Sequence, residues 1–251
     1  MKSKITFSSL LAALLLLALT AQAADTPLQV AVYNPVQLVG ADKSVTGLRL
    51  SVIYGKNRNV KGLDLGLSTA TTGHLVGIQC GLLHIVDGNV DALQFGLMNI
   101  TNGSVSGLQW SLMNITNGSF SGLQPGVFNV TNGSVSGIQS GGMNVTNGDF
   151  TGLQWGGLNV TNGSVSGLQV GGMNVSNGSL SGLQVALLNA INGTCSGLQT
   201  GLYSYCKKQS GLQLGLVNKA ERAHGVQIGI VNIIKHDGFM PFFPFVNWSF
   251  K

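Results

Sequence analysis

The chain has 251 residues, a formal net charge of +5, 8% charged side chains, 44% hydrophobic residues and 37 glycines. This hydrophobic content excludes a charge-rich disordered polymer. No Lys or Arg occurs between Gly62 and Cys206, which excludes the continuous basic stripe of a nucleic-acid-binding surface. Three cysteines cannot form a complete disulfide framework, and the pairing of Cys195 with Cys206 stays open.

Residues 1–23 are typical of a secretory signal peptide. Lys2 and Lys4 supply the positive charge, residues 10–19 the apolar segment, and Ala-Gln-Ala at 21–23 a small-residue cleavage site. An apolar segment of this length is too short to cross a bilayer as a helix. We therefore expect the mature chain to be exported.

After a lead-in or cap at 24–46, the range 47–238 consists of tandem units of about fifteen residues. The opening glycine of a unit lies at 47, 62 and 77, and then at every fifteenth residue from 107 to 197, with Ala92 in the skipped place. The spacing shortens in the last units, up to Gly238. Self-similarity at a fixed period indicates a repeat architecture, and we predict that these units form one solenoid.

Within each unit, with the opening glycine counted as position zero, apolar residues recur at positions one, six, eight and thirteen. Side chains on one face of a strand are two residues apart, so the apolar positions of one strand are all odd or all even. The apolar positions change between odd and even three times per unit, near Asn-Gly and Ser-Gly turn signals, and each change indicates a corner. We therefore predict an all-β parallel solenoid of about 12–13 three-sided coils, with the four apolar positions as its core. The alternative is an outer-membrane up-and-down β-barrel, whose strands need about nine to eleven alternating residues that the parity change interrupts.

The Gly-Leu-Gln-x-Gly-Leu-x-Asn repeat and the segments 44–50, 53–60 and 241–245 resemble those of a bacterial family of surface repeat-containing proteins. The resemblance covers nearly all of the mature chain. It implies export and a location at the cell surface, in the outer membrane or in the periplasm of a bacterium. It implies no reaction, no cofactor and no defined partner.

No catalytic motif is present, and we predict a structural or adhesive protein and not an enzyme. A catalytic site needs unlike residues that converge once, whereas a repeat multiplies like residues. The competing enzyme hypothesis depends on a charged cluster of Tyr54, Lys56, Arg58 and Asp64. His84 replaces the repeated Asn of its unit and is expected to be a polar filler, so we expect neither a metal site nor a cofactor.

The repeated Asn and Thr residues are predicted to face outward, because they alternate with the predicted core. They would form a rigid, uncharged grid suited to cell-wall or extracellular polysaccharide, with an ice surface as a weaker candidate. The grid comprises Asn114, Thr116, Asn129, Thr131, Asn144, Thr146, Asn159 and Thr161. Trp110 and Trp155 share position three, whose parity predicts burial.

The last thirteen residues, 239–251, contain five Phe and one Trp. Clustered aromatics either cap the last coil or contact a membrane, so a membrane-anchored protein is the alternative function. The residues of the membrane contact would be Phe242, Phe243, Phe245 and Trp248. Neither the hand of the solenoid nor the oligomeric state follows from the sequence.

Overall fold

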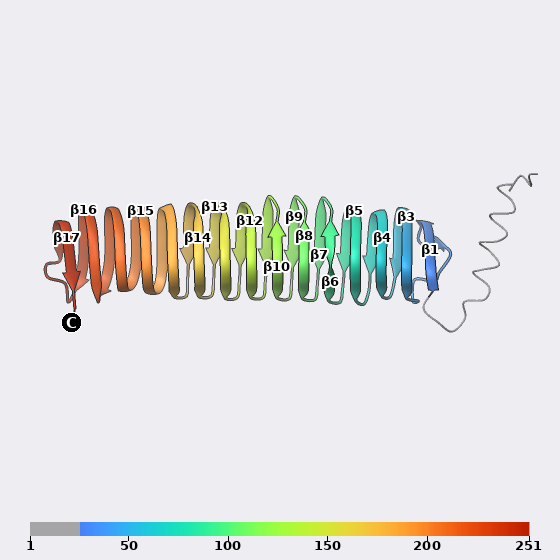
Figure 1. The fold of residues 1–251 in the computed structure, drawn as a ribbon, viewed down its shortest axis with the longest axis horizontal. Helices are drawn as coiled ribbons and strands as arrows, with labels where there is room; N and C mark the ends of the chain where they lie inside the picture. Colours follow the sequence, from blue (N-terminus) through green and yellow to red (C-terminus); the bar gives the residue numbers. More distant parts are fainter. Residues whose placement is uncertain (1–25, 251) are drawn as a thin grey trace, which may run out of the picture. The chain divides into compact units, whose positions relative to one another are not determined.

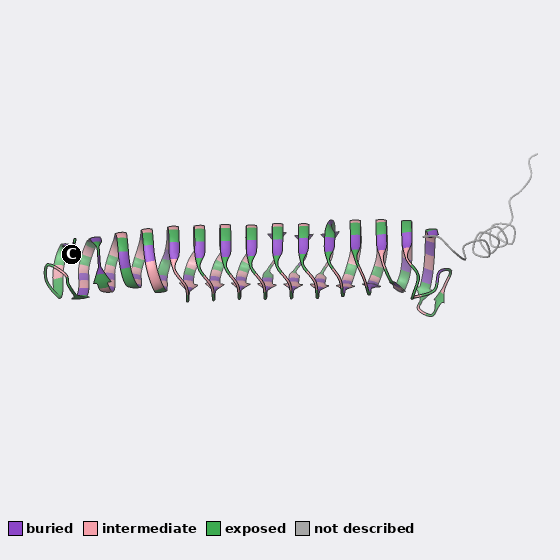
Figure 2. Cartoon of the chain, turned by 90° about the horizontal axis from the view of Figure 1, so that it is seen from below, coloured by how far each residue is buried: buried purple, intermediate pink, exposed green. Residues whose placement is uncertain are grey.

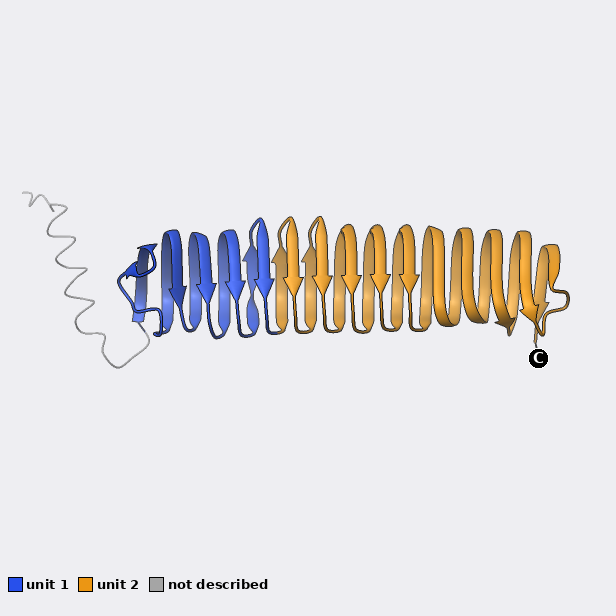
Figure 3. Cartoon of the chain, turned by 180° about the vertical axis from the view of Figure 1, so that it is seen from behind, with its two compact units in different colours: residues 1–103 blue, residues 104–251 orange. Residues whose placement is uncertain are grey.

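The computed structural model describes residues 26–250, and the predicted signal peptide at 1–23 lies outside the described residues. The described chain is all-β, without a helix, and forms a parallel β-solenoid of about 14 turns and not a barrel (Figure 1). The predicted fold class is therefore confirmed. Two compact units, residues 1–103 and 104–251, are built from the same kind of coil (Figure 3).

In the first unit, strands pair in parallel with the strand one repeat later. Gly62 faces Gly77, and Leu63 faces Ile78, between β4 and β5. β1 pairs in parallel with β3, so the lead-in forms a coil of its own and raises the number of turns above the predicted one. The strands are β1 (Thr26–Tyr33), β2 (Val36–Gln37), β3 (Val45–Asn57), β4 (Val60–Thr71), β5 (Leu75–Val86), β6 (Val90–Phe95) and β7 (Met98–Thr101).

In the second unit the register is again one full repeat, so identical residues stack. Asn144 faces Asn159 and Gln139 faces Gln154 between β12 and β13. The strands are β8 (Val105–Trp110), β9 (Met113–Thr116), β10 (Phe120–Pro125), β11 (Phe128–Thr131), β12 (Val135–Thr146), β13 (Phe150–Thr161), β14 (Val165–Ser176), β15 (Leu180–Ala223), β16 (Gly225–His236) and β17 (Phe242–Ser249).

The opening glycine of a coil is required by the backbone. Gly152 has a φ of +128°, a conformation that residues with a Cβ atom rarely adopt. A Cβ atom at this place would also collide with the carbonyl oxygen of Gly137 in the preceding coil. The recurrence of glycine in the sequence therefore follows from a corner that is repeated in successive coils.

The interior of the coils is mainly polar, which reverses the predicted arrangement. In one coil of the second unit, Gln124, Asn129 and Thr131 are fully buried, whereas Leu123 is 49% and Phe128 44% exposed. The predicted core positions one, six and eight are therefore wrong. Position thirteen alone is confirmed, through buried residues such as Phe120.

Two corners explain where the inward positions fall. Positions fourteen and one both point outward around the opening glycine, and positions five and six both point outward after the next corner. Inward side chains therefore occupy positions two, seven, nine and thirteen, and position four where it is not glycine, as at Ser111, which is 4% exposed. Trp110 and Trp155, predicted to be buried at position three, are 60% and 61% exposed, so that prediction is also wrong.

Short antiparallel pairings cover the outer strand of each unit. β2 pairs with β1, and the main-chain N–H of Val39 donates to Oε1 of the buried Gln29 at 2.8 Å. β17 pairs antiparallel with β16, so the aromatic tail covers the edge of that strand. Such covers block sheet edges that would otherwise pair with another chain.

Candidate functional site

The buried glutamines of successive coils form a directed hydrogen-bond ladder. In the second unit, Gln124 Nε2 donates to Gln109 Oε1 at 2.8 Å, and Gln139 Nε2 donates to Gln124 Oε1 at 2.7 Å. Equivalent bonds continue through the later coils to Gln227, which donates to Gln213 at 2.7 Å. These amides are buried but hydrogen-bonded, because each finds an identical partner one coil away.

Buried asparagines form a second ladder with the opposite direction. Asn129 Nδ2 donates to Asn144 Oδ1 at 2.8 Å, and Asn144 Nδ2 donates to Asn159 Oδ1 at 2.8 Å. Thr146 Oγ1 adds to the glutamine ladder by donating to Gln139 Oε1 at 3.0 Å. The interior is thus a hydrogen-bonded network, similar in principle to the amide ladders of cross-β assemblies.

The predicted ligand-facing grid is wrong, because its side chains lie inside the coils. All eight residues of the predicted grid have no exposed area, namely Asn114, Thr116, Asn129, Thr131, Asn144, Thr146, Asn159 and Thr161. The physical reason is the stacking of identical residues, which lets buried polar groups satisfy one another. A ligand outside the coil cannot reach these amides and hydroxyls.

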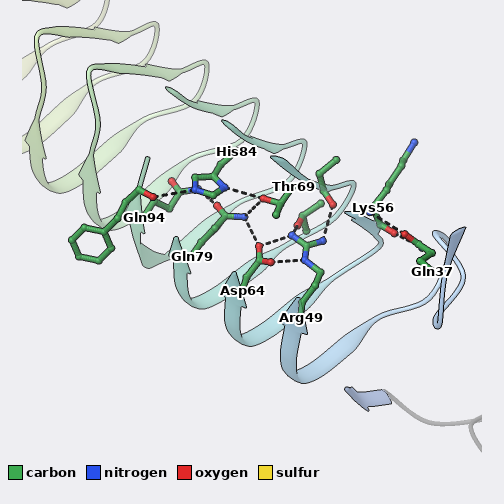
Figure 4. Close-up of polar contacts among 11 residues, drawn as sticks. Gln37, Arg49, Lys56, Asp64, Thr69, Gln79, His84 and Gln94 are labelled. Atoms are coloured by element: carbon green, nitrogen blue, oxygen red, sulfur yellow. Dashed lines mark hydrogen bonds and ion pairs between the residues drawn. The ribbon is translucent and has the colours of Figure 1, made fainter. Parts of the chain in front are cut away.

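A buried ion pair occupies the glutamine position of two coils in the first unit (Figure 4). Arg49 Nε donates to Asp64 Oδ1 at 2.7 Å and Nη2 to Oδ2 at 2.5 Å, and neither side chain is exposed. Gln79 Nε2 also donates to Asp64 Oδ2 at 2.7 Å, and Gln94 Nε2 donates to Gln79 Oε1 at 2.7 Å. Sequence reasoning missed this pair, although the repeat register places Arg49 and Asp64 at the glutamine position.

The charged cluster of the enzyme hypothesis is not brought together. Asp64 is enclosed with Arg49, whereas Arg58 is exposed. Tyr54 packs against Tyr33 with 5.8 Å between ring centroids. These residues therefore do not form the cleft that the hypothesis requires.

His84 fills the asparagine position of its coil as a neutral side chain. Its Nδ1 lies 2.8 Å from Thr69 Oγ1, and its Nε2 lies 3.1 Å from the carbonyl oxygen of Phe95. Gln79 Nε2 donates to Thr69 Oγ1 at 3.0 Å, which leaves the Thr69 hydroxyl to donate to Nδ1 and fits a proton on Nε2. Burial lowers the pKa of His84.

Outward side chains from position one to position eight are mostly apolar. They lie on two strands that face each other across the interior, since Thr116 at position nine donates to Gln109 at position two of the same coil at 3.0 Å. The two strands meet at the corner of positions four and five, and we name the surface that wraps around this corner the apolar face. Side chains at positions one, three, five and six provide most of its exposed area, and Figure 2 shows how exposed and buried bands recur along each unit. In the first unit the exposed residues include Leu63, Leu67, Ile78, Leu82, Leu93 and Leu97. In the second they include Trp110, Leu112, Leu123, Val127, Phe128, Ile138, Trp155, Met173, Leu187, Leu188, Leu202 and Leu216.

The turns at positions ten to twelve are polar, and we name them the polar ridge. Exposed asparagines stack there as well: Asn132 Nδ2 donates to Asn117 Oδ1 at 2.7 Å, and Asn147 Nδ2 donates to Asn132 Oδ1 at 2.6 Å. The ridge continues through exposed serines at position fourteen, such as Ser136. Each coil is therefore amphipathic, with the apolar face around one corner and polar turns at another.

The four aromatic residues predicted to contact a membrane divide into two pairs. Phe242 and Phe245 are 54% and 73% exposed. Phe243 and Trp248 are half-buried against Phe239, at 5.6 Å and 4.5 Å between ring centroids. The tail thus combines a packed inner side with exposed rings.

Two buried thiols face each other inside the coils of the second unit. Cys195 and Cys206 are both free and at most 1% exposed. A hydrogen bond with Cys195, together with burial, raises the pKa of Cys206. The Cys206 thiol is therefore protonated and poorly reactive as a nucleophile.

The part of the chain that the structure describes contains no helix long and apolar enough to span a membrane. Within residues 26–250, no group of His, Cys, Asp and Glu side chains is arranged to hold a metal ion. Comparison with known protein families, with curated proteins and with solved structures finds no match for this chain.

Proposed function

We propose that the chain is an exported, surface-associated repeat protein with a structural or adhesive role, and that it binds through its apolar face. The observation that carries this proposal is the inverted coil, which buries its amides and exposes ladders of Leu, Ile, Val, Met, Phe and Trp. Large contiguous apolar surfaces mark interaction sites. The predicted signal peptide and the resemblance to bacterial surface repeat-containing proteins support a location at the cell surface.

The proposal assigns no catalytic activity. The ion pair of Arg49 and Asp64 has no exposed area, so a substrate in solution does not reach it. The exposed positions of the coils carry mostly apolar side chains, which lack acid–base or nucleophilic chemistry. This distribution supports a binding role.

A repetitive polysaccharide is a second candidate partner because of two exposed rings. Trp110 and Trp155 occupy the same position three coils apart within the second unit and are 60% and 61% exposed. At about 4.8 Å per coil the rings are roughly 14 Å apart. Replacing both by Ala should reduce the pull-down of the protein by purified cell-surface polysaccharide if this candidate is correct.

The main test measures retention on cells of the producing bacterium. The test variant combines Leu123→Ser, Leu187→Ser and Leu202→Ser, which alter exposed residues of the apolar face. The matched control combines Ser121→Thr, Ser136→Thr and Ser166→Thr at exposed positions on the polar side. We expect washing to release the test variant and to leave the control on the cells, with circular dichroism showing that both are folded. Equal retention of the two variants contradicts the proposal.

A further inference from the structure

We propose that the apolar face inserts into the surface of a lipid bilayer, led by the corner at position five, with the polar ridge directed toward water. This inference rests on the proposed function and names the partner of the same face. The arrangement is that of an amphipathic interfacial helix, built here from coils of β-strand.

The chemistry of the face favours acyl chains over a protein partner. Between 104 and 206 its outward positions carry no charged side chain. Protein–protein interfaces contain about one hydrogen bond per 100–200 Å², and this face offers few side-chain groups to make them. Acyl chains require none.

The backbone of the coils is also suited to lipid contact. β13 pairs in parallel with β12 on one side and with β14 on the other at every residue except Gly157 at the corner. Turn amides are bonded as well, since the N–H of Gly148 donates to the carbonyl oxygen of Gly133 at 3.1 Å. A segment in contact with lipid must satisfy its backbone groups internally, and these coils meet that condition.

The relief of the face favours a fluid partner over a second copy of the chain. Position five carries Val127 and Leu187, but glycine in the three coils between them, at Gly142, Gly157 and Gly172. A rigid copy would need a complementary relief to pack against this alternation. Mobile acyl chains fill it without such a match.

Two tryptophans within the face match the chemistry of a bilayer interface. Trp110 and Trp155 are exposed at position three, and tryptophan is enriched at the level of lipid headgroups. Lys207 and Lys208 are exposed at positions ten and eleven, on the polar ridge and so on the side directed toward water. Binding should therefore depend on the apolar side chains and little on the charge of the lipid.

The test is sedimentation of the full mature chain with vesicles of phosphatidylcholine, alone or mixed with phosphatidylglycerol. We expect similar binding to both, and a partition coefficient at least about tenfold lower for the triple Leu→Ser variant described above. The triple Ser→Thr control should bind like the wild type. Replacing Lys207 and Lys208 by Gln, on the side directed toward water, should leave binding to both kinds of vesicle unchanged.

A second measurement needs no variant in the coils. Quenchers attached to the acyl chains should reduce the fluorescence of Trp110 and Trp155 when the protein binds, with Trp248→Phe removing the remaining tryptophan. Absence of vesicle binding, or undiminished binding by a folded triple Leu→Ser variant, overturns the inference. If the face holds the protein on cells but not on vesicles, the lipid inference fails and the proposed function stands. A dimer that the triple variant dissociates, without vesicle binding, identifies a second copy as the partner instead.

Discussion

Replacing one partner of the buried ion pair should destabilise the first unit far more than replacing both. Arg49→Gln removes two of the three N–H donors shown for the Asp64 carboxylate, at 2.7 Å and 2.5 Å, and leaves the bond from Gln79 at 2.7 Å. Hydrogen bonds to charged groups contribute about 1.5–3 kcal/mol each. The expected loss is therefore about 3–5 kcal/mol, the range for a buried charge left without its partner.

The double variant Arg49→Gln/Asp64→Gln provides the matched control. It extends the glutamine ladder of Gln79 and Gln94 by two coils, with neutral amides in place of the charges. Replacing a buried ion pair by well-fitting neutral groups is often close to neutral in stability. We expect the free energy of opening to return to within about 1 kcal/mol of the wild type.

Native-state hydrogen exchange of the amides in β3, β4 and β5 is the suitable assay. A repeat protein need not unfold in a single two-state transition, so a midpoint for the whole chain would not report on this unit. If Arg49→Gln lowers the local opening free energy by less than about 1 kcal/mol, the carboxylate is hydrated and the enclosed network does not exist as described. A double variant as unstable as the single one would show that neutral amides do not fit at these positions.

Three further predictions concern the interior. Burial lowers the pKa of His84 from 6.5, so on acidification the unfolded chain takes up a proton at this side chain before the folded chain does. The local opening free energy should be full above about pH 6.5 and fall by up to about 1.4 kcal/mol per pH unit below it. His84→Asn should abolish this pH dependence, as measured by hydrogen exchange. Ser204 interrupts the asparagine ladder and leaves its own Oγ and Asn218 Oδ1 without a partner. Ser204→Asn should therefore raise the local opening free energy by about 1 kcal/mol. A decrease in the local opening free energy would show that the amide does not fit at this position. A disulfide oxidant should link Cys195 to Cys206 when local opening exposes the two thiols, which are close enough for Cys195 to raise the pKa of Cys206. One of the three cysteines should then remain to react with maleimide after denaturation, and three reactive thiols would contradict the pairing.

The repeat register was the most informative property of the sequence. The recurrence of Gly62 and Gly77 predicted which residues pair between coils, and the pairing of β4 with β5 confirms it. The lead-in was not predicted as a coil because Pro27 stands in the place of the opening glycine, and only Leu28 and Gln29 match the start of the repeat. Only the parallel pairing of β1 with β3 reveals that coil.

The assignment of inside and outside could not be made from the alternation alone. A period of two separates the residues of a strand into two faces but does not state which face is buried. The usual rule places apolar residues inside, because buried amides normally lack partners. In this fold Asn144 meets Asn129 and Asn159 at 2.8 Å, so stacking removes the penalty on which the rule depends.

The variation among the repeats of this one chain fits that inverted assignment. Position two is Gln in every coil from Gln79 to Gln227, whereas the adjacent position three changes among Cys, Phe, Trp, Pro, Ser, Val, Thr, Leu and Ile. An inward amide must match the amides above and below it, because one different side chain leaves two neighbours without a hydrogen bond. An outward side chain meets no such constraint from the next coil. The constancy of position two is therefore explained by the ladder. The persistence of mainly apolar side chains at position three, where the ladder imposes nothing and water would accept polar ones, points to a partner outside the coil that prefers apolar contact.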